Sequence, residues 1–117
     1  MKRDDDLIRE LLLEMEAEDD YLFSMVEALD SQPDEQKRYG HALLLCDAGL
    51  VEQRENMTFR ITAAGHDYLA AMRDPGIWAT TKAKVAETGG NATLTMLQDL
   101  ATALLRKKVS DLTGIDL

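Results

Sequence analysis

The sequence predicts a mainly α-helical fold with a small two-stranded antiparallel wing, a winged helix-turn-helix followed by C-terminal helices. Three observations predict it: apolar residues recur at helical spacing towards both ends, a glycine ends a central helix, and two short strand-forming runs follow that glycine. The length of 117 residues fits a single domain over 1–117. We expect its core at about 4–74 and a helical extension at about 75–112.

The first predicted helix covers Asp4–Ala17, where apolar residues form one stripe at spacings of one, three and four: Leu7, Ile8, Leu11, Leu12 and Met15. Asp4, Asp5 and Asp6 stand where an N-cap and the positive end of a helix dipole favour carboxylates. An acidic run over 16–20 follows, and the apolar residues after it predict a short second helix: Tyr21, Leu22, Phe23, Met25, Val26 and Leu29.

A turn at 31–34 leads into the third predicted helix, Glu35–Ala48, with Asp34 as its expected cap. One buried stripe of that helix is formed by His41, Leu44, Leu45 and Ala48. Gly49 follows at the position where a left-handed residue ends a helix, so we expect the helix to stop there.

Two short strands are predicted over Leu50–Arg54 and Thr58–Ile61, with residues 55–57 as the hairpin tip. Three more helices follow. Thr62 caps Ala63–Met72, the Asp74-Pro75-Gly76 break precedes Ile77–Ala86, and the last helix runs from about Thr93 to Val109. This order is that of a winged helix-turn-helix in which Glu35–Ala48 is the recognition helix.

The net charge of −9 is concentrated in the first third of the chain. Residues 1–36 hold 13 acidic and 3 basic residues, whereas the remaining residues hold 9 acidic and 10 basic ones. Because carboxylates repel phosphate, any nucleic-acid surface is expected in the later part of the chain.

The sequence lacks the signatures of an enzyme, a metalloprotein or a membrane protein. It has no phosphate-binding, dinucleotide-binding or serine-hydrolase motif, so we expect a non-enzymatic protein with no catalytic residues and no cofactor. Cys46 is the single cysteine and is expected to be buried and inert, and His41 and His66 lack metal-binding spacing. No secretory or membrane-spanning segment is present, which predicts a cytoplasmic protein.

Two functions are compatible with these features. The first is a DNA-binding regulator, whose candidate contacts on the recognition helix and wing are Gln36, Lys37, Tyr39, Arg54 and Arg60. We expect such a regulator to form a homodimer through its first and last helices. A solvated helix face explains Gln36 and Lys37 equally well, and Arg54 and Arg60 could instead pair with Glu52 or Glu55 across the hairpin.

The second function is a protein-interaction module, such as an accessory or anti-defence factor of a prophage, that presents its acidic N-terminal face to a basic partner. The candidate contacts are Asp4, Asp5, Asp6, Glu14, Glu18 and Trp78. The simpler interpretation of Trp78 is a core anchor between helices, beside Tyr68 and Ile77. The placement of Lys37, Arg54 and Arg60 separates the two functions, since DNA requires one continuous positive face.

The chain resembles a bacterial and prophage family, domain of unknown function 2513, over nearly its whole length. The residues that carry the resemblance are Met1-Lys2-Arg3-Asp4, Asp6-Leu7-Ile8-Arg9, His41, Leu44-Leu45, Asp47-Ala48-Gly49-Leu50, Thr62, Gly65-His66-Asp67-Tyr68-Leu69, Arg73-Asp74, Trp78 and Thr81-Lys82. The resemblance implies a winged-helix-like fold and a frequent origin in mobile elements, and it brings no catalytic residues. This chain differs in having Arg38 where an aliphatic residue is expected, and in a shorter wing between Arg54 and Arg60.

Overall fold

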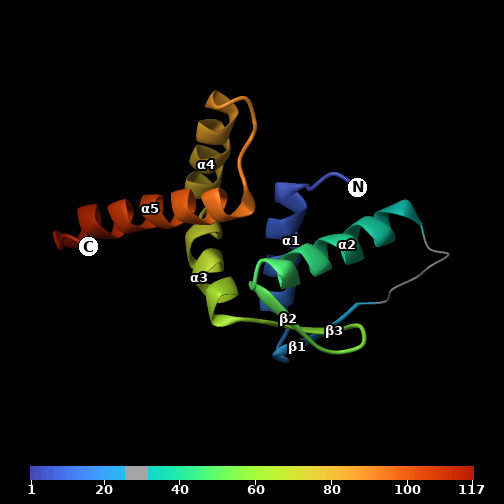
Figure 1. The fold of residues 1–117 in the computed structure, drawn as a ribbon. Helices are drawn as coiled ribbons and strands as arrows, with labels where there is room; N and C mark the ends of the chain where they lie inside the picture. The colour runs from blue at the N-terminus through green and yellow to red at the C-terminus, as the bar shows by residue number, and fades with distance from the viewer. Residues whose placement is uncertain (26–31) are drawn as a thin grey trace. The chain divides into compact units, whose positions relative to one another are not determined.

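The computed structural model describes residues 1–25 and 32–117, which form two compact units, residues 1–66 and 67–117. The described parts of the chain are mainly helical, with five helices and one three-stranded antiparallel sheet (Figure 1). The elements in chain order are α1 (Asp5–Ala17), β1 (Leu22–Ser24), α2 (Pro33–Asp47), β2 (Val51–Glu55), β3 (Thr58–Ile61), α3 (Ala63–Met72), α4 (Pro75–Glu87) and α5 (Leu94–Thr113).

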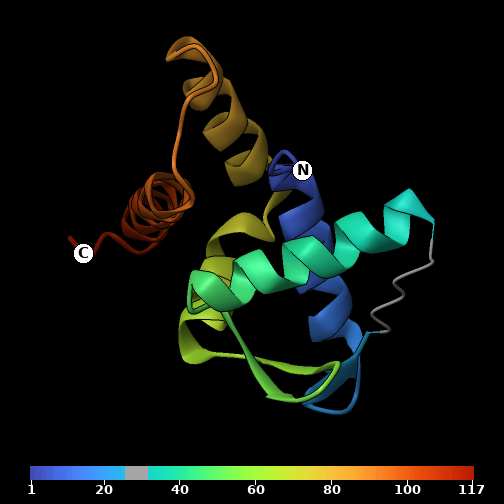
Figure 2. The same ribbon diagram turned by 45° about the vertical axis from the view of Figure 1, so that its right-hand side comes forward.

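The first unit is built on the packing of α1 against α2, which crosses it in Figure 2. Four of the five residues in the predicted stripe of α1 are buried and Leu7 is half-buried, and α1 also contacts β3. Each large apolar side chain removed from water in this way contributes about 1.5–3 kcal/mol. The buried residues of the unit are Ile8, Leu11, Leu12, Met15, Met25, Tyr39, His41, Ala42, Leu45, Leu50, Val51 and Phe59.

The two predicted hairpin strands are confirmed as β2 and β3, which pair antiparallel. The predicted number of two strands is wrong, because the sheet has a third strand and the order β1-β3-β2. The short helix predicted from Tyr21 is wrong where the structure describes it, since Leu22–Ser24 is β1; Val26 and Leu29 lie outside the described residues. Phe23 pairs with Phe59 of β3, and the Asp20 carboxylate accepts the backbone N–H of Leu22 at 3.1 Å. A partner strand distant in sequence therefore decides this segment, and local periodicity does not reveal it.

The start of α2 also differs from the prediction, whereas its end agrees. Asp34 is not the cap: Pro33 occupies the first helical position after Gln32, and Asp34 lies in the first turn. At the other end Gly49 has φ +75°, as predicted for a helix stop. The backbone N–H of Leu50 donates to the carbonyl of Leu45 at 3.0 Å, which is the bond of a Schellman motif that spans six residues.

The junction between the hairpin and α3 is held by Thr62 and Gly65. The Thr62 hydroxyl caps α3 by accepting the N–H of Gly65 at 3.1 Å, as predicted, and donates to the carbonyl of Gly49. Gly65 is buried so close to β2 that a Cβ atom there would collide with the Leu50 carbonyl and the Ile61 side chain. The absence of a side chain at position 65 is therefore what lets α3 begin at this point.

The second unit holds the remainder of α3 with α4 and α5, and α4 packs against α5. Asp74 caps α4, since its Oδ1 accepts the N–H of Gly76 at 2.8 Å, and its Oδ2 accepts from Lys108 of α5. The helix α5 continues four residues past the predicted end at Val109, to Thr113, where Gly114 with φ +72° ends it. The buried residues are Tyr68, Leu69, Ala71, Met72, Ile77, Trp78, Thr81, Leu97 and Ala101.

The substitution Gly65→Ala should destabilise the protein by roughly 1–3 kcal/mol or more, because the added methyl meets backbone that cannot move aside. Chemical denaturation monitored by circular dichroism measures this free energy of unfolding. The matched control is Gly40→Ala inside α2, where the methyl meets only the flexible Met1 side chain and removes the entropic cost of a helical glycine. Equal losses for both variants would contradict the assigned role of Gly65.

Candidate interaction surface

The two basic residues of α2 are both engaged by carboxylates of the α1 region. The Lys37 ammonium donates to Asp4 Oδ2 at 3.0 Å, and the Arg38 guanidinium grips both Glu14 oxygens, at 2.7 and 3.3 Å. This geometry raises the pKa of Arg38 and lowers the pKa of Asp4, in the latter chiefly through the Lys37 hydrogen bond. Arg38, which departs from the family pattern, thus has a structural partner on the neighbouring helix.

The two basic residues of the hairpin share one acceptor, Glu52. Arg54 Nη1 lies 2.8 Å from Oε1 of Glu52, and Arg60 Nη2 lies 2.8 Å from Oε2. The register explains the second pair, since Glu52 stands directly opposite Arg60 across the two strands. The pKa of Glu52 is lowered by hydrogen bonds from Arg54 and Arg60. The predicted pairing with Glu52 is therefore confirmed, but only Arg60 reaches it across the hairpin, whereas Arg54 pairs with it along the same strand, β2.

The other two DNA-contact candidates lie in different environments. Gln36 is exposed near the start of α2. Tyr39 is only 7% exposed, and its ring packs edge-on against Phe59 with centroids 5.9 Å apart. The structure therefore places Tyr39 in the core of the first unit, away from any surface that meets a ligand.

The acidic candidates lie along α1 and its two ends. Asp4 caps the helix by accepting the N–H of Leu7 at 3.1 Å, which confirms the capping interpretation, and Asp5 pairs with Arg3 at 2.7 Å. Asp6 and Glu18 are exposed, and Glu14 is exposed while holding Arg38. Residues 1–66 contain 16 acidic and 7 basic residues, a net charge of −9, so the whole excess of the chain falls in this unit.

Trp78, the remaining partner candidate, belongs to the core of the second unit. It is 4% exposed, and the Lys82 ammonium lies 5.7 Å from its ring centroid. The core interpretation of Trp78 is confirmed by this burial.

A fully buried histidine joins α2 to the N-terminal segment. His41 Nε2 accepts the backbone N–H of Asp4 at 2.8 Å, while Nδ1 lies 2.8 Å from the carbonyl of Lys37. Because a carbonyl only accepts and a backbone N–H only donates, the ring is neutral with its proton on Nδ1. Sequence analysis predicted a buried His41 but not its partner, which lies 37 positions earlier in the chain.

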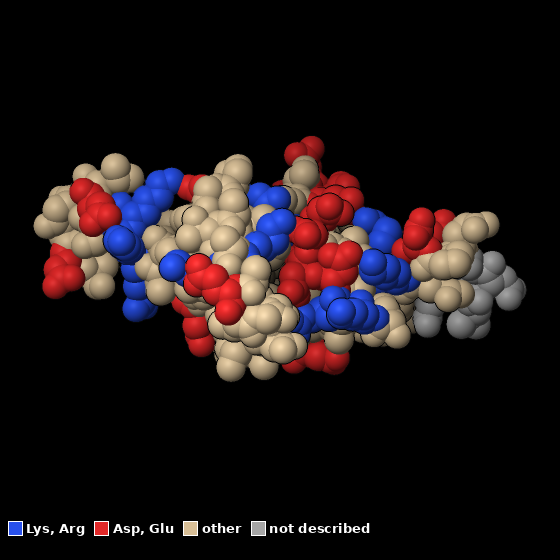
Figure 3. Space-filling view, turned by 90° about the horizontal axis from the view of Figure 1, so that it is seen from above, with Lys and Arg blue, Asp and Glu red and all other residues tan. Residues whose placement is uncertain are grey.

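Basic and acidic side chains alternate on the face drawn in Figure 3, where blue groups lie beside red ones. In the first unit Lys37, Arg38, Arg54 and Arg60 are each paired with a carboxylate, as described above. The structure therefore does not gather these four residues into one positive face free of carboxylates.

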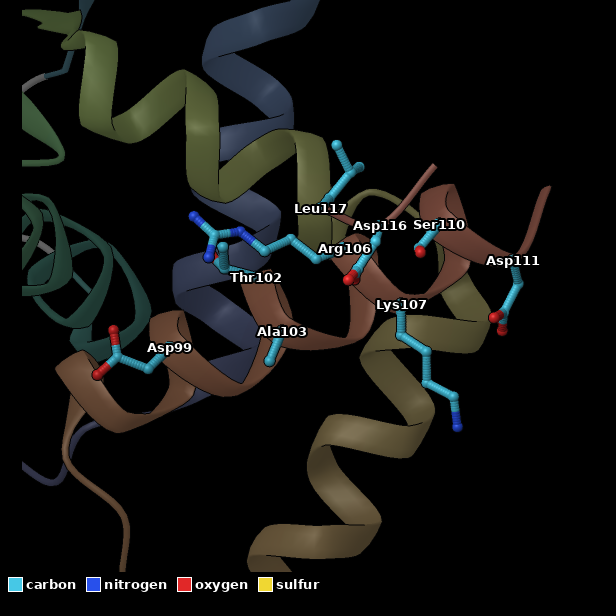
Figure 4. A pocket seen from close by; sticks show the side chains of 9 residues that line it. All are labelled: Asp99, Thr102, Ala103, Arg106, Lys107, Ser110, Asp111, Asp116 and Leu117. Atoms are coloured by element: carbon cyan, nitrogen blue, oxygen red, sulfur yellow. The ribbon is translucent and has the colours of Figure 1, made fainter. Parts of the chain in front are cut away.

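One hollow of the second unit, of about 660 Å³, lies along α5. It is lined by side chains of both charge signs, including Arg106, Lys107 and Asp116. Figure 4 shows these side chains spreading away from the helix instead of converging. Among the described residues no group of His, Cys, Asp and Glu is placed to hold a metal ion. Burial raises the pKa of the Cys46 thiol.

The remaining surface features concern α5 and membranes. Met96 and Leu112 of α5 are exposed, and the homodimer expected through the first and last helices stays a prediction.

None of the helices in the described parts of the chain has the length and apolar composition needed to cross a membrane.

Replacing Lys37 with Met should raise the pKa of Asp4 towards its ordinary value, because the Lys37 hydrogen bond is the main cause of its lowering. The lowered pKa stabilises the folded state above about pH 4, where the unfolded carboxyl is ionised, and this contribution is lost as the pH falls through the folded pKa. A carboxyl-carbon NMR titration measures the change. Arg38→Met is the control, since Arg38 contacts Glu14; an unchanged Asp4 pKa in Lys37→Met would refute the pairing.

Comparison with known proteins gave one family match. The profile of a family described as a hypothetical protein, domain of unknown function 2513, matches residues 2–91. Neither the curated proteins nor the solved structures gave a match. Since the match covers more than half of the sequence and all of the first unit except Met1, the chain belongs to the family of domain of unknown function 2513.

Proposed function

We propose that this protein is a non-enzymatic interaction module whose acidic α1 face binds a basic surface of a protein partner. The observation that carries the proposal is that carboxylates of the first unit pair with its basic residues and still leave a large excess of negative charge. All four basic residues of α2, β2 and β3 are held by the protein's own carboxylates, yet the unit retains a net charge of −9. A surface with this excess attracts cations and repels phosphate.

The proposed scaffold is a winged helix, with α2 in the place of the recognition helix and the β2–β3 hairpin as the wing. The order of α1, β1, α2, β2 and β3 and the position of β3 in the middle of the sheet support this assignment. The scaffold makes α1 rigid, since four of its residues are buried. A rigid helix presents its outer charges to a partner with little entropic cost.

The charges on α1 are spaced regularly. Asp6, Glu10, Glu14 and Glu18 follow one another at intervals of four residues, which corresponds to about 6 Å along a helix. All four are exposed, and this row, with the acidic residues 19 and 20 after it, forms the proposed binding face. Guanidinium and ammonium groups of a partner can pair with carboxylates of this row, in which Glu14 also holds Arg38.

DNA binding is the second candidate. Gln36 is exposed near the start of α2, the helix that would be the recognition helix of the proposed winged helix. To bind DNA, the basic side chains of Lys37, Arg54 and Arg60 would first have to release their carboxylate partners within the protein. This exchange lowers the binding free energy gained from each phosphate contact.

Fluorescence anisotropy with a labelled oligo-arginine peptide tests the proposal directly. The wild-type protein should bind the peptide, and the triple variant Asp6→Lys, Glu10→Lys, Glu18→Lys should bind it at least roughly tenfold more weakly, because it reverses the proposed face. Circular dichroism of each variant checks that the fold is intact.

The matched control carries the same change of charge on the second unit, as Asp99→Lys, Asp111→Lys, Asp116→Lys. These three residues are exposed, and the control should retain most of the peptide affinity. If both variants lose affinity equally, net charge alone is responsible and the assignment of α1 as the binding face fails.

A further inference from the structure

We propose that the contact between Asp4 and His41 is a proton-sensitive latch that holds the N-terminal segment on α2. The ring of His41 is fully buried and both nitrogens are used, Nε2 by the backbone N–H of Asp4 and Nδ1 by the carbonyl of Lys37, each at 2.8 Å. The inference depends on this geometry and goes beyond the proposed function.

Only the neutral ring can make both bonds. A second proton would have to sit on Nε2, where it meets the backbone N–H of Asp4 and turns an acceptor into a donor. The bond to Lys37 survives this change, because Nδ1 donates in either state. Protonation therefore acts on one side of the ring, the side facing Asp4.

The charged groups next to the ring come from the two segments that it joins. Asp4 contributes a carboxylate that already accepts from the Leu7 N–H and from Lys37 Nζ, and Lys37 contributes that ammonium. Arg38, one turn before His41 on α2, is held by Glu14. The Asp4 carboxylate thus already accepts one hydrogen bond at each oxygen, Oδ1 from the α1 cap and Oδ2 from Lys37, and these bonds hold it at the start of α1.

Release at Asp4 would loosen three contacts together: the backbone bond to His41, the cap on α1 and the ion pair with Lys37. The side chain of Met1 also lies against Gly40, so the segment before α1 rests on the same part of α2. Acidification is the trigger, because a second proton on the ring turns Nε2 from an acceptor into a donor.

An NMR titration of the full-length protein labelled with ¹⁵N tests the latch, since the chain has only two histidines and His66 is exposed. The ring ¹⁵N shifts report protonation of His41, and hydrogen exchange reports the protection of the Asp4 amide. We expect neutral His41 to carry its proton on Nδ1, and the Asp4 amide to lose roughly tenfold or more of its protection as the ring protonates.

The amide of Leu11, further along α1, distinguishes the latch from unfolding, since its protection should persist through the same pH range. A ring that protonates while Asp4 stays protected would overturn the proposal. So would a ring that stays neutral until every amide exchanges together. His41→Gln, which cannot titrate, should remove the pH dependence of Asp4 exchange, and the wild-type titration decides the question if that variant does not fold.

Discussion

The first unit has far fewer basic than acidic residues, and this limits which of its carboxylates can form ion pairs. Sixteen acidic and seven basic residues share positions 1–66, so most carboxylates cannot form an ion pair within the unit. The basic side chains go where they join elements: Lys37 and Arg38 connect α2 to the α1 region, and Arg60 with Glu52 connects the two hairpin strands. Among the described residues of the unit, many carboxylates are exposed, including Glu10, Glu18 and Glu55, which gives the unit its acidic surface.

The seam between α1 and α2 shows how polar and apolar interactions divide this work. Buried leucine and isoleucine side chains supply the stabilisation, whereas the bonds from Asp4 and Glu14 set which residues face each other. Exposed ion pairs add little free energy by themselves. Each of these pairs nevertheless places a carboxylate directly beside a basic side chain, at Lys37, Arg38, Arg54 and Arg60.

Local chemistry predicted much of this fold, and non-local pairing accounts for what it missed. The stop at Gly49, the cap at Thr62 and the stripe of α1 depend on residues within one or two turns, and all three agree with the structure. The strand β1 depends on β3, more than thirty positions away, and was mistaken for a helix. The candidate contacts were predicted by residue type alone. Sequence could suggest Glu52 as a partner of Arg54 and Arg60, but only the folded chain reveals that Asp4 and Glu14 hold Lys37 and Arg38.

The central claim is that the basic residues of α2 and the hairpin serve the fold and are not available to nucleic acid. Fluorescence anisotropy with random and native-locus DNA duplexes, at low and physiological salt, tests it most directly. The wild-type protein and a Lys37→Ala, Arg54→Ala, Arg60→Ala variant should both fail to bind at physiological salt. Salt-sensitive binding by the wild-type protein that the variant loses would contradict the claim and establish a DNA-binding domain.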